Sequence, residues 1–187
     1  ADQRFQVRPV AEVRGVRHHL GADPVQEAEA VVADRHRLGA DALAVVDVDP
    51  KSKTYGSVLN RLDFPNKGDE FHHFGWNACS SALSPFSGHA FLRRRYLIIP
   101  GIRSSRIYVV DTQPDPVRPQ IVKVIEPEEV LRKAGYTRPH TIHCGPEGIY
   151  VTALGSPGGK GPGGVFLMDH TTFEIIGPWE KDRGPQY

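Results

Sequence analysis

The fold is decided by the stretch Arg106-Ile107-Tyr108-Val109-Val110-Asp111, a hydrophobic run that ends in an aspartate. β-Branched and aromatic residues are enriched in strands, so the run predicts a strand. Its aspartate predicts a turn, because an aspartate side chain can bond nearby backbone amides. A proline-rich turn and a second apolar run over residues 121–125 follow. The stretch therefore predicts two adjacent strands joined by a turn.

The same pattern occurs twice more in the chain. The other strand pairs are residues 43–47 with 57–62, and residues 164–169 with 173–177. The closing aspartates are Asp47, Asp111 and Asp169. Further strands are predicted upstream, over residues 95–99, 140–144 and 149–154. A repeated unit of four short strands with insertions is typical of a β-propeller blade.

The repeat predicts an all-β fold class, made of β-propeller blades with little helix. Blades are expected around residues 41–66, 67–127 and 135–183, which makes about two and a half blades. One helix is expected over residues 126–134, because glutamates follow Pro127 and two basic residues precede Gly135. Residues 1–40 are expected to be a divergent N-terminal segment of uncertain structure, in which 22–38 are compatible with a helix.

So few blades cannot close a ring, since propellers typically have about four to eight. Stacked repeats bury their faces only against neighbours. The chain is therefore expected to be a piece of a longer protein, and completion by partner chains is the alternative.

The composition excludes some classes of function. Lysine and arginine number 23 against 22 acidic residues, which offers no electrostatic argument for binding nucleic acid or an anionic membrane. No apolar run reaches about 18 residues, so no integral membrane segment is expected. No apolar core of a signal peptide is visible either, which leaves the compartment open between cytoplasm and periplasm.

Two histidine pairs are candidate metal ligands. His72 and His73 precede the first strand of one unit, and His140 and His143 lie in the first strand of the next. The first strand of each blade lines the propeller axis, so the pairs can converge there. Imidazole suits copper, zinc and iron. Hydrogen-bonded packing near the axis is the alternative, but the two pairs together favour a metal. His170, directly after a turn aspartate, is expected to be exposed.

Regular strands would not direct all four imidazoles to one ion. Adjacent residues of a strand point to opposite faces, and so do residues three apart. One histidine of each pair is therefore expected to be structural, unless the backbone departs from a regular strand. Asp69 and Glu70 are candidates to orient an imidazole by accepting its second N–H, and the alternative is that they lie in solvent.

The chain has two cysteines, Cys79 and Cys144. A disulfide framework is not expected at this density. A free cysteine is often a small buried hydrophobe, which is the ordinary interpretation of both. A thiolate is also a nucleophile and a soft ligand for copper(I) or selenium, and Ser80 and Ser81 offer hydroxyl donors to Cys79.

The sequence resembles the selenium-binding protein family, whose members include methanethiol oxidases. The strongest match is His72-His73-Phe74-Gly75-Trp76-Asn77-Ala78-Cys79-Ser80-Ser81. Further matching segments are residues 44–50, 69–71, 104–111, 123–127, 138–144 and 163–167. The resemblance begins at about residue 41. It implies a seven-bladed propeller, of which this chain is an N-terminal fragment.

The resemblance also implies a copper-dependent oxidoreductase that acts on a sulfur group with oxygen as acceptor. It implies oxidation of methanethiol with O2 and water to formaldehyde, hydrogen sulfide and hydrogen peroxide. Carried onto this sequence, the catalytic residues are His72, His73 and His140, and His143 is a further metal ligand. Cys79 corresponds to the cysteine proposed to bind selenium.

Two alternatives stay open beside the enzyme. One is a propeller that binds selenium or a partner protein without turnover. It is favoured if Cys79→Ser abolishes selenium labelling while no thiol oxidation is seen. The other is an inactive truncation of the enzyme. Low solubility or oligomerisation of the isolated chain would favour it, because open blade edges are prone to aggregate.

Overall fold

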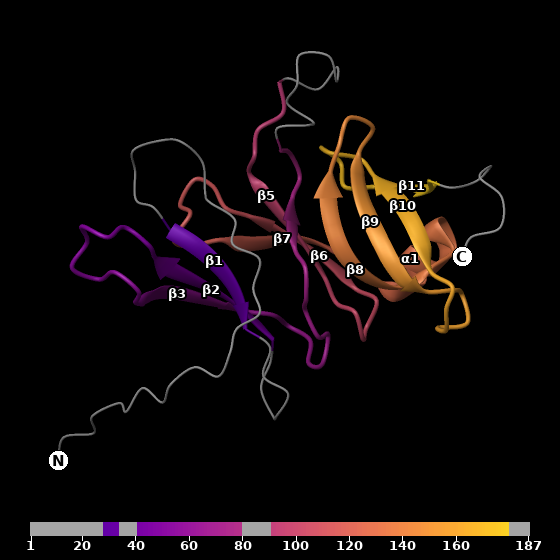
Figure 1. The fold of residues 1–187 in the computed structure, drawn as a ribbon, viewed down its shortest axis with the longest axis horizontal. Coiled ribbons are helices and arrows are strands. Elements are labelled where there is room, and N and C mark those ends of the chain that lie inside the picture. Colours follow the sequence, from indigo (N-terminus) through magenta and orange to yellow (C-terminus); the bar gives the residue numbers. More distant parts are fainter. Residues whose placement is uncertain (1–27, 34–40, 80–90, 180–187) are drawn as a thin grey trace.

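The computed structural model describes residues 28–33, 41–79 and 91–179, whose strands form three antiparallel sheets (Figure 1). The first sheet has the order β1-β2-β3, which are Ala28–Ala33, Ala42–Asp47 and Val58–Asp63. The second has the order β4-β5-β6-β7, which are Gly75–Trp76, Tyr96–Pro100, Ile107–Asp111 and Gln120–Ile125. The third has the order β11-β10-β9-β8, which are Ile175–Pro178, Gly164–Met168, Ile149–Gly155 and Thr137–Cys144.

The predicted mostly-β fold with little helix is confirmed for the described residues. The helix among them is α1, Pro127–Ala134, between β7 and β8. Acidic residues stand in its first turn and Arg132 and Lys133 in its last, which suits the helix dipole. Gly135 ends it with a left-handed φ of 72°, and its N–H donates to the Leu131 carbonyl oxygen.

The three repeat aspartates stabilise equivalent turns. In each turn the backbone N–H two residues later donates to the aspartate Oδ1. The bonds run from Asp49 to Asp47 at 3.0 Å, from Gln113 to Asp111 at 3.0 Å and from Thr171 to Asp169 at 2.8 Å. The hydrogen bond from a backbone amide to an aspartate side chain, which led us to predict these turns, is therefore present in each of them.

Residues 22–38 are compatible with a helix in sequence, but the part of that segment that the structure describes is a strand. Residues 28–33 form β1, which pairs antiparallel with β2, so that Ala28 lies opposite Asp47 and Ala33 opposite Ala42. Alanine favours a helix in isolation, but pairing with a neighbouring strand overrides such a weak preference. Residues 1–27 and 34–40 lie outside the described part of the chain.

The second sheet is buried on both faces. From β6, Ile107 and Val109 belong to the hydrophobic core shared with the third sheet, whereas Tyr108 and Val110 belong to the core shared with the first sheet. Successive side chains of a strand point to opposite faces, so β6 separates the two cores. Figure 1 shows the second sheet between the other two. The three sheets therefore stack in chain order.

Glu174 links three elements of this stack by charge. It precedes β11, and its carboxylate Oε1 lies 2.6 Å from Lys123 Nζ of β7. The other oxygen, Oε2, pairs with Lys133 of α1. The hydrogen bonds from Lys123 and Lys133 lower the pKa of Glu174 to about 2.

We expect Glu174→Gln to lower the melting temperature at neutral pH but not in strong acid. A carboxyl group whose folded pKa is depressed stabilises the fold above its unfolded pKa of about 4.3, and this stabilisation is lost as the pH falls towards 2. Melting curves of both proteins between pH 7 and 2 would measure the difference. Glu128→Gln, at an exposed position of α1, is the control and should change little. A difference that stays constant down to pH 2 would contradict the ion-pair explanation.

Candidate metal centre and an adjoining disulfide

Three imidazoles lie together where the second and third sheets meet. His72 and His73 come from the segment before β4, and His140 comes from β8. One ligand nitrogen of each lies within 4.8 Å of those of the other two. The ring centroid of His140 is 4.7 Å from that of His73 and 5.2 Å from that of His72. Among the residues that the structure describes, this histidine triad is the group that could hold a metal ion.

A β-bulge positions His140 in the triad. Pro139 pairs with Ala153 and Thr141 with Thr152 across β8 and β9, so His140 is the extra residue on its strand. A bulge interrupts the alternation of side chains and can re-aim one of them, and bulges are common beside active sites. The strict alternation that would separate the histidines therefore does not hold at this position.

The segment before β4 also departs from a regular strand. Phe71 forms an antiparallel bridge to Gly101 within the second sheet, whereas His73 forms a parallel bridge to Thr141 of the third. At His73 the segment thus contacts β8 of the third sheet, while Gly75 and Trp76 pair with β5 of the second. This bridge brings His73 to the strand that carries the bulge, and His72 lies close enough to join the triad.

Gly75 allows β4 and β8 to approach each other closely. A Cβ atom at Gly75 would lie only 2.6 Å from the carbonyl oxygen of Ile142 in β8. Any larger residue would have to push β4 away from β8, because the obstructing atom belongs to the backbone. The glycine is therefore required by the packing that assembles the triad.

Glu70 orients His72, as the sequence predicts for one of the two acidic candidates. Its Oε1 lies 3.3 Å from His72 Nε2, and its Oε2 accepts a 2.8 Å hydrogen bond from Arg103 Nε. Burial by itself would raise the pKa of Glu70, but the bonds from His72 and Arg103 lower it on balance. The carboxylate therefore accepts the Nε2–H of His72 and leaves Nδ1 for a metal ion. Asp69 instead bonds Arg106 and Tyr108.

His140 is held in the form that binds metals. Its Nδ1 lies 2.9 Å from Thr141 Oγ1, which leaves Nε2 for an ion. Burial, followed by the nearby charges of His73, His72 and Arg138, lowers the pKa of His140. The neutral imidazole that results is the ligand form of histidine.

The donor set of the triad fits a transition metal. Two nitrogens that bind one ion at about 2.0 Å can be at most about 4 Å apart, so small ring rotations would close the present spacing. Imidazole nitrogens suit copper, zinc and iron. Three protein ligands also leave a coordination position for a substrate or water, as catalytic sites require.

His143 lies outside the triad. Its side chain is exposed, and its Nδ1 donates a 2.7 Å hydrogen bond to the carbonyl oxygen of Cys144. Regular alternation resumes after the bulge, so Ile142 and Cys144 are buried while His143 faces outwards. The structure thus brings together His72, His73 and His140 but not the fourth predicted ligand.

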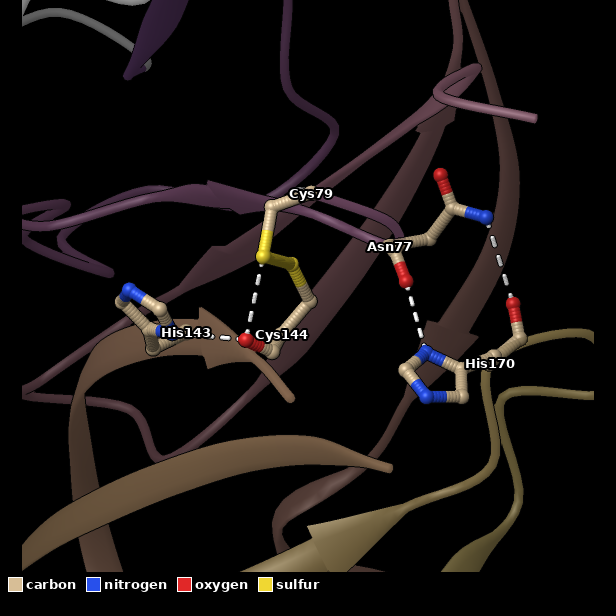
Figure 2. The surroundings of a disulfide bond; sticks show 5 residues. All are labelled: Asn77, Cys79, His143, Cys144 and His170. Atoms are coloured by element: carbon tan, nitrogen blue, oxygen red, sulfur yellow. Dashed lines mark hydrogen bonds between the residues drawn. A yellow bond between two sulfur atoms is a disulfide. The ribbon is translucent and has the colours of Figure 1, made fainter. Parts of the chain in front are cut away.

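Cys79 and Cys144 form a disulfide, so the interpretation of both as free cysteines is wrong (Figure 2). Their Cα atoms are 5.9 Å apart, within the usual span of a disulfide, although 65 residues separate them in sequence. Low cysteine content argues against a disulfide framework but not against one pair that the fold brings together. Cys79 is therefore no free thiolate here. Ser80 and Ser81 lie outside the described residues.

Asn77 and His170 tie the second and third sheets together a second time (Figure 2). His170 Nδ1 donates to the Asn77 carbonyl oxygen at 2.7 Å, and Asn77 Nδ2 donates to the His170 carbonyl oxygen at 3.3 Å. His170 is only 3% exposed, so the expectation of an exposed side chain is wrong. Its partner stands 93 residues away, which no local pattern reveals.

Residues 23–187 match the family described as 56kDa selenium binding protein (SBP56). The chain belongs to the SBP56 family. The match starts well before residue 41, so the family likeness extends further towards the N-terminus than the recognised motifs. Strand β1 lies within the matched range.

SBP56 relatives carry two kinds of name. A methanethiol oxidase of Xenopus laevis is 51% identical over 143 residues, which are 76% of this chain and 29% of that protein. Selenium-binding protein 2 of Arabidopsis thaliana is 46% identical over 149 residues, which are 79% of this chain and 30% of that protein. The chain therefore spans less than a third of the length of these relatives.

A solved structure is similar to this SBP56 chain. It is the X-ray structure of a hypothetical selenium-binding protein from Sulfolobus tokodaii, with 52% identity and a TM-score of 0.81. The likeness covers 89% of this chain and 37% of that one. Within the described residues of the SBP56 chain, no helix has the length and apolar character needed to span a bilayer.

Proposed function

We propose that this chain is the N-terminal part of a methanethiol oxidase whose copper ion is held by His72, His73 and His140. The observation that carries this proposal is the convergence of three imidazoles from two sheets. It occurs in a chain whose relatives include proteins named methanethiol oxidase. The reaction oxidises methanethiol with O2 and water to formaldehyde, hydrogen sulfide and hydrogen peroxide.

The proposed complete fold is a seven-bladed propeller, with blades here around residues 41–66, 67–127 and 135–183. The stacking of the three sheets supports it. The outer face of the third sheet also supports a propeller, because it carries partly exposed apolar side chains. These are Tyr150, Leu154, Leu167 and Ile176. Such a face suits a further stacked sheet. The rest of the longer protein would supply it, and the first blade would also contain β1.

The residues around the triad have distinct roles in this proposal. Glu70, held by Arg103, keeps His72 in one orientation, and burial lowers the pKa of His140, which favours its neutral form. The side chain of His72 is 36% exposed, so a small thiol can reach the triad from solvent. Copper, when bound, would supply redox chemistry with oxygen and a soft Lewis acid for sulfur.

Selenium binding at Cys79 is the second candidate function. It is favoured by relatives that are named selenium-binding proteins. In the disulfide form Cys79 has no thiolate to offer, so the bond to Cys144 would have to be reduced first. A partner-binding propeller without turnover is a variant of this candidate.

The decisive experiment compares the complete protein with and without copper. We expect the copper-loaded protein to consume methanethiol and to release formaldehyde and peroxide in equal amounts. The metal-free protein should do neither, and full activity without metal would exclude the role of copper. Selenium uptake without any thiol oxidation would favour the second candidate. The 187-residue chain is a useful comparison, because as an isolated fragment it should bind metal without turnover.

A further inference from the structure

A small pocket lies against the Cys79–Cys144 disulfide. Its volume is about 120 Å³, and both cysteines, Trp76, Arg94 and His143 contribute to its lining. Pockets for drug-sized ligands have roughly 300–1,000 Å³, so this one suits a ligand of only a few heavy atoms. The pocket therefore gives a small molecule direct access to the bond.

We propose that this disulfide is a thiol–disulfide exchange site, which takes a small thiol at Cys79 Sγ. The site is separate from the histidine triad and does not depend on the metal or on the oxidation proposed above. Its ligand class is a thiol of one or two carbons, because the pocket is small and both cysteines line it.

The two cysteines differ in exposure to solvent. Cys79 is partly exposed, whereas Cys144 is only 3% exposed. Exchange requires access to the sulfur under attack, so an incoming thiolate reaches Cys79. Cys144 is then the leaving thiolate, and the positive charge of Arg94, which also lines the pocket, favours a thiolate.

We assign to His143, which also lines the pocket, the role of accepting the proton of the incoming thiol. Its Nδ1–H donates to the Cys144 carbonyl oxygen, so the neutral ring carries its free lone pair on Nε2. Cys79 Sγ lies 3.1 Å from the same carbonyl oxygen, so the His143 imidazole and the disulfide both contact this oxygen (Figure 2). A disulfide sulfur has no hydrogen, so this contact becomes a hydrogen bond only after reduction.

The exchange balances with two thiol molecules. The first gives its proton to His143 Nε2, and its sulfur bonds to Cys79 as the Cys79–Cys144 bond breaks. The electron pair of that bond goes to Cys144, which then takes a proton. A second thiol attacks the mixed disulfide and releases the external disulfide and the Cys79 thiol. Two external thiols are thus oxidised as the protein disulfide is reduced.

The test uses the complete protein, oxidised and then treated with 2-mercaptoethanol. After acid quenching, peptide mass spectrometry should find the adduct on Cys79 and an alkylatable thiol at Cys144. Glutathione is far too large for the pocket, so it should react at roughly a tenth of the 2-mercaptoethanol rate or slower. An adduct on Cys144, equal rates for both thiols, or absence of the bond after oxidation would each overturn the proposal. All of these measurements use the wild-type protein.

His143→Gln tests the proton acceptor. At pH 7 the exchange should slow by about 100-fold, the usual contribution of a positioned base. Well above the pKa of the external thiol the attacking species is already a thiolate, so the variant should approach the wild-type rate. A deficit of the same size at every pH would indicate a structural role only and would overturn the assignment.

Discussion

His140→Ala should weaken binding of Cu²⁺ to the chain by about 100-fold or more. Loss of a residue that merely supports a metal ligand costs about 10- to 100-fold in affinity, and loss of a ligand should cost at least as much. His140 is also the member of the triad that comes from the third sheet, whereas both others come from the segment before β4. Without it the remaining pair spans only one sheet.

Calorimetric titration with Cu²⁺ at pH 7 would measure this loss. The matched control is His143→Ala, which removes an exposed histidine of the same strand and should leave copper affinity unchanged. In the complete protein, methanethiol oxidation should fall in parallel with copper binding in His140→Ala. Equal affinities in the wild-type and His140→Ala chains would disprove the triad as the copper site.

Asp69→Ala should destabilise the fold by about 3 kcal/mol, the lower end of the range for breaking a buried charged pair. Asp69 is completely buried. Its carboxylate accepts hydrogen bonds from Arg106 Nη1 at 3.0 Å and from Tyr108 OH at 2.6 Å. We expect a loss at the lower end of this range because Arg106 would still be hydrogen-bonded to Glu126.

Tyr108 explains why the loss should still be large. The side chain is fully buried, and burial together with the hydrogen bond to Asp69 raises its pKa, so the hydroxyl keeps its proton and donates. Without Asp69 that buried donor would lose its acceptor, which costs about 1–3 kcal/mol. The backbone N–H of Asp69 also donates to Asp41 at 2.8 Å, so the network links the first and second sheets.

Urea unfolding of both proteins would measure the effect. Asp63→Ala is the control, because it breaks an exposed ion pair with Arg61 and should cost at most about 1 kcal/mol. Tyr108→Phe, which keeps the ring but removes the hydroxyl, should fall between the two. Equal losses for Asp69→Ala and Asp63→Ala would show that the buried network contributes no more than a surface pair.

The strands, the turns and the helix α1 could be predicted because their signals are local. Each strand pair was marked by an apolar run that ends in an aspartate, and the structure gives each aspartate the predicted backbone bond. The strand at residues 28–33 was missed for the opposite reason. An alanine-rich segment has a helical preference of its own, but its pairing with β2 depends on residues elsewhere in the chain.

The sequence by itself determined which residues could bind a metal and on which two segments they stand. Only the tertiary structure decided which of them meet, because the decision depends on two departures from regular strands. The bulge at His140 and the bridge from His73 to Thr141 are consequences of how the second and third sheets pack.

The same packing joined Cys79 to Cys144 and buried His170 against Asn77. These contacts connect residues that are 65 and 93 positions apart. Alternation and turn chemistry act over a few residues only, so they can place a side chain on a strand but cannot choose its partner in another sheet.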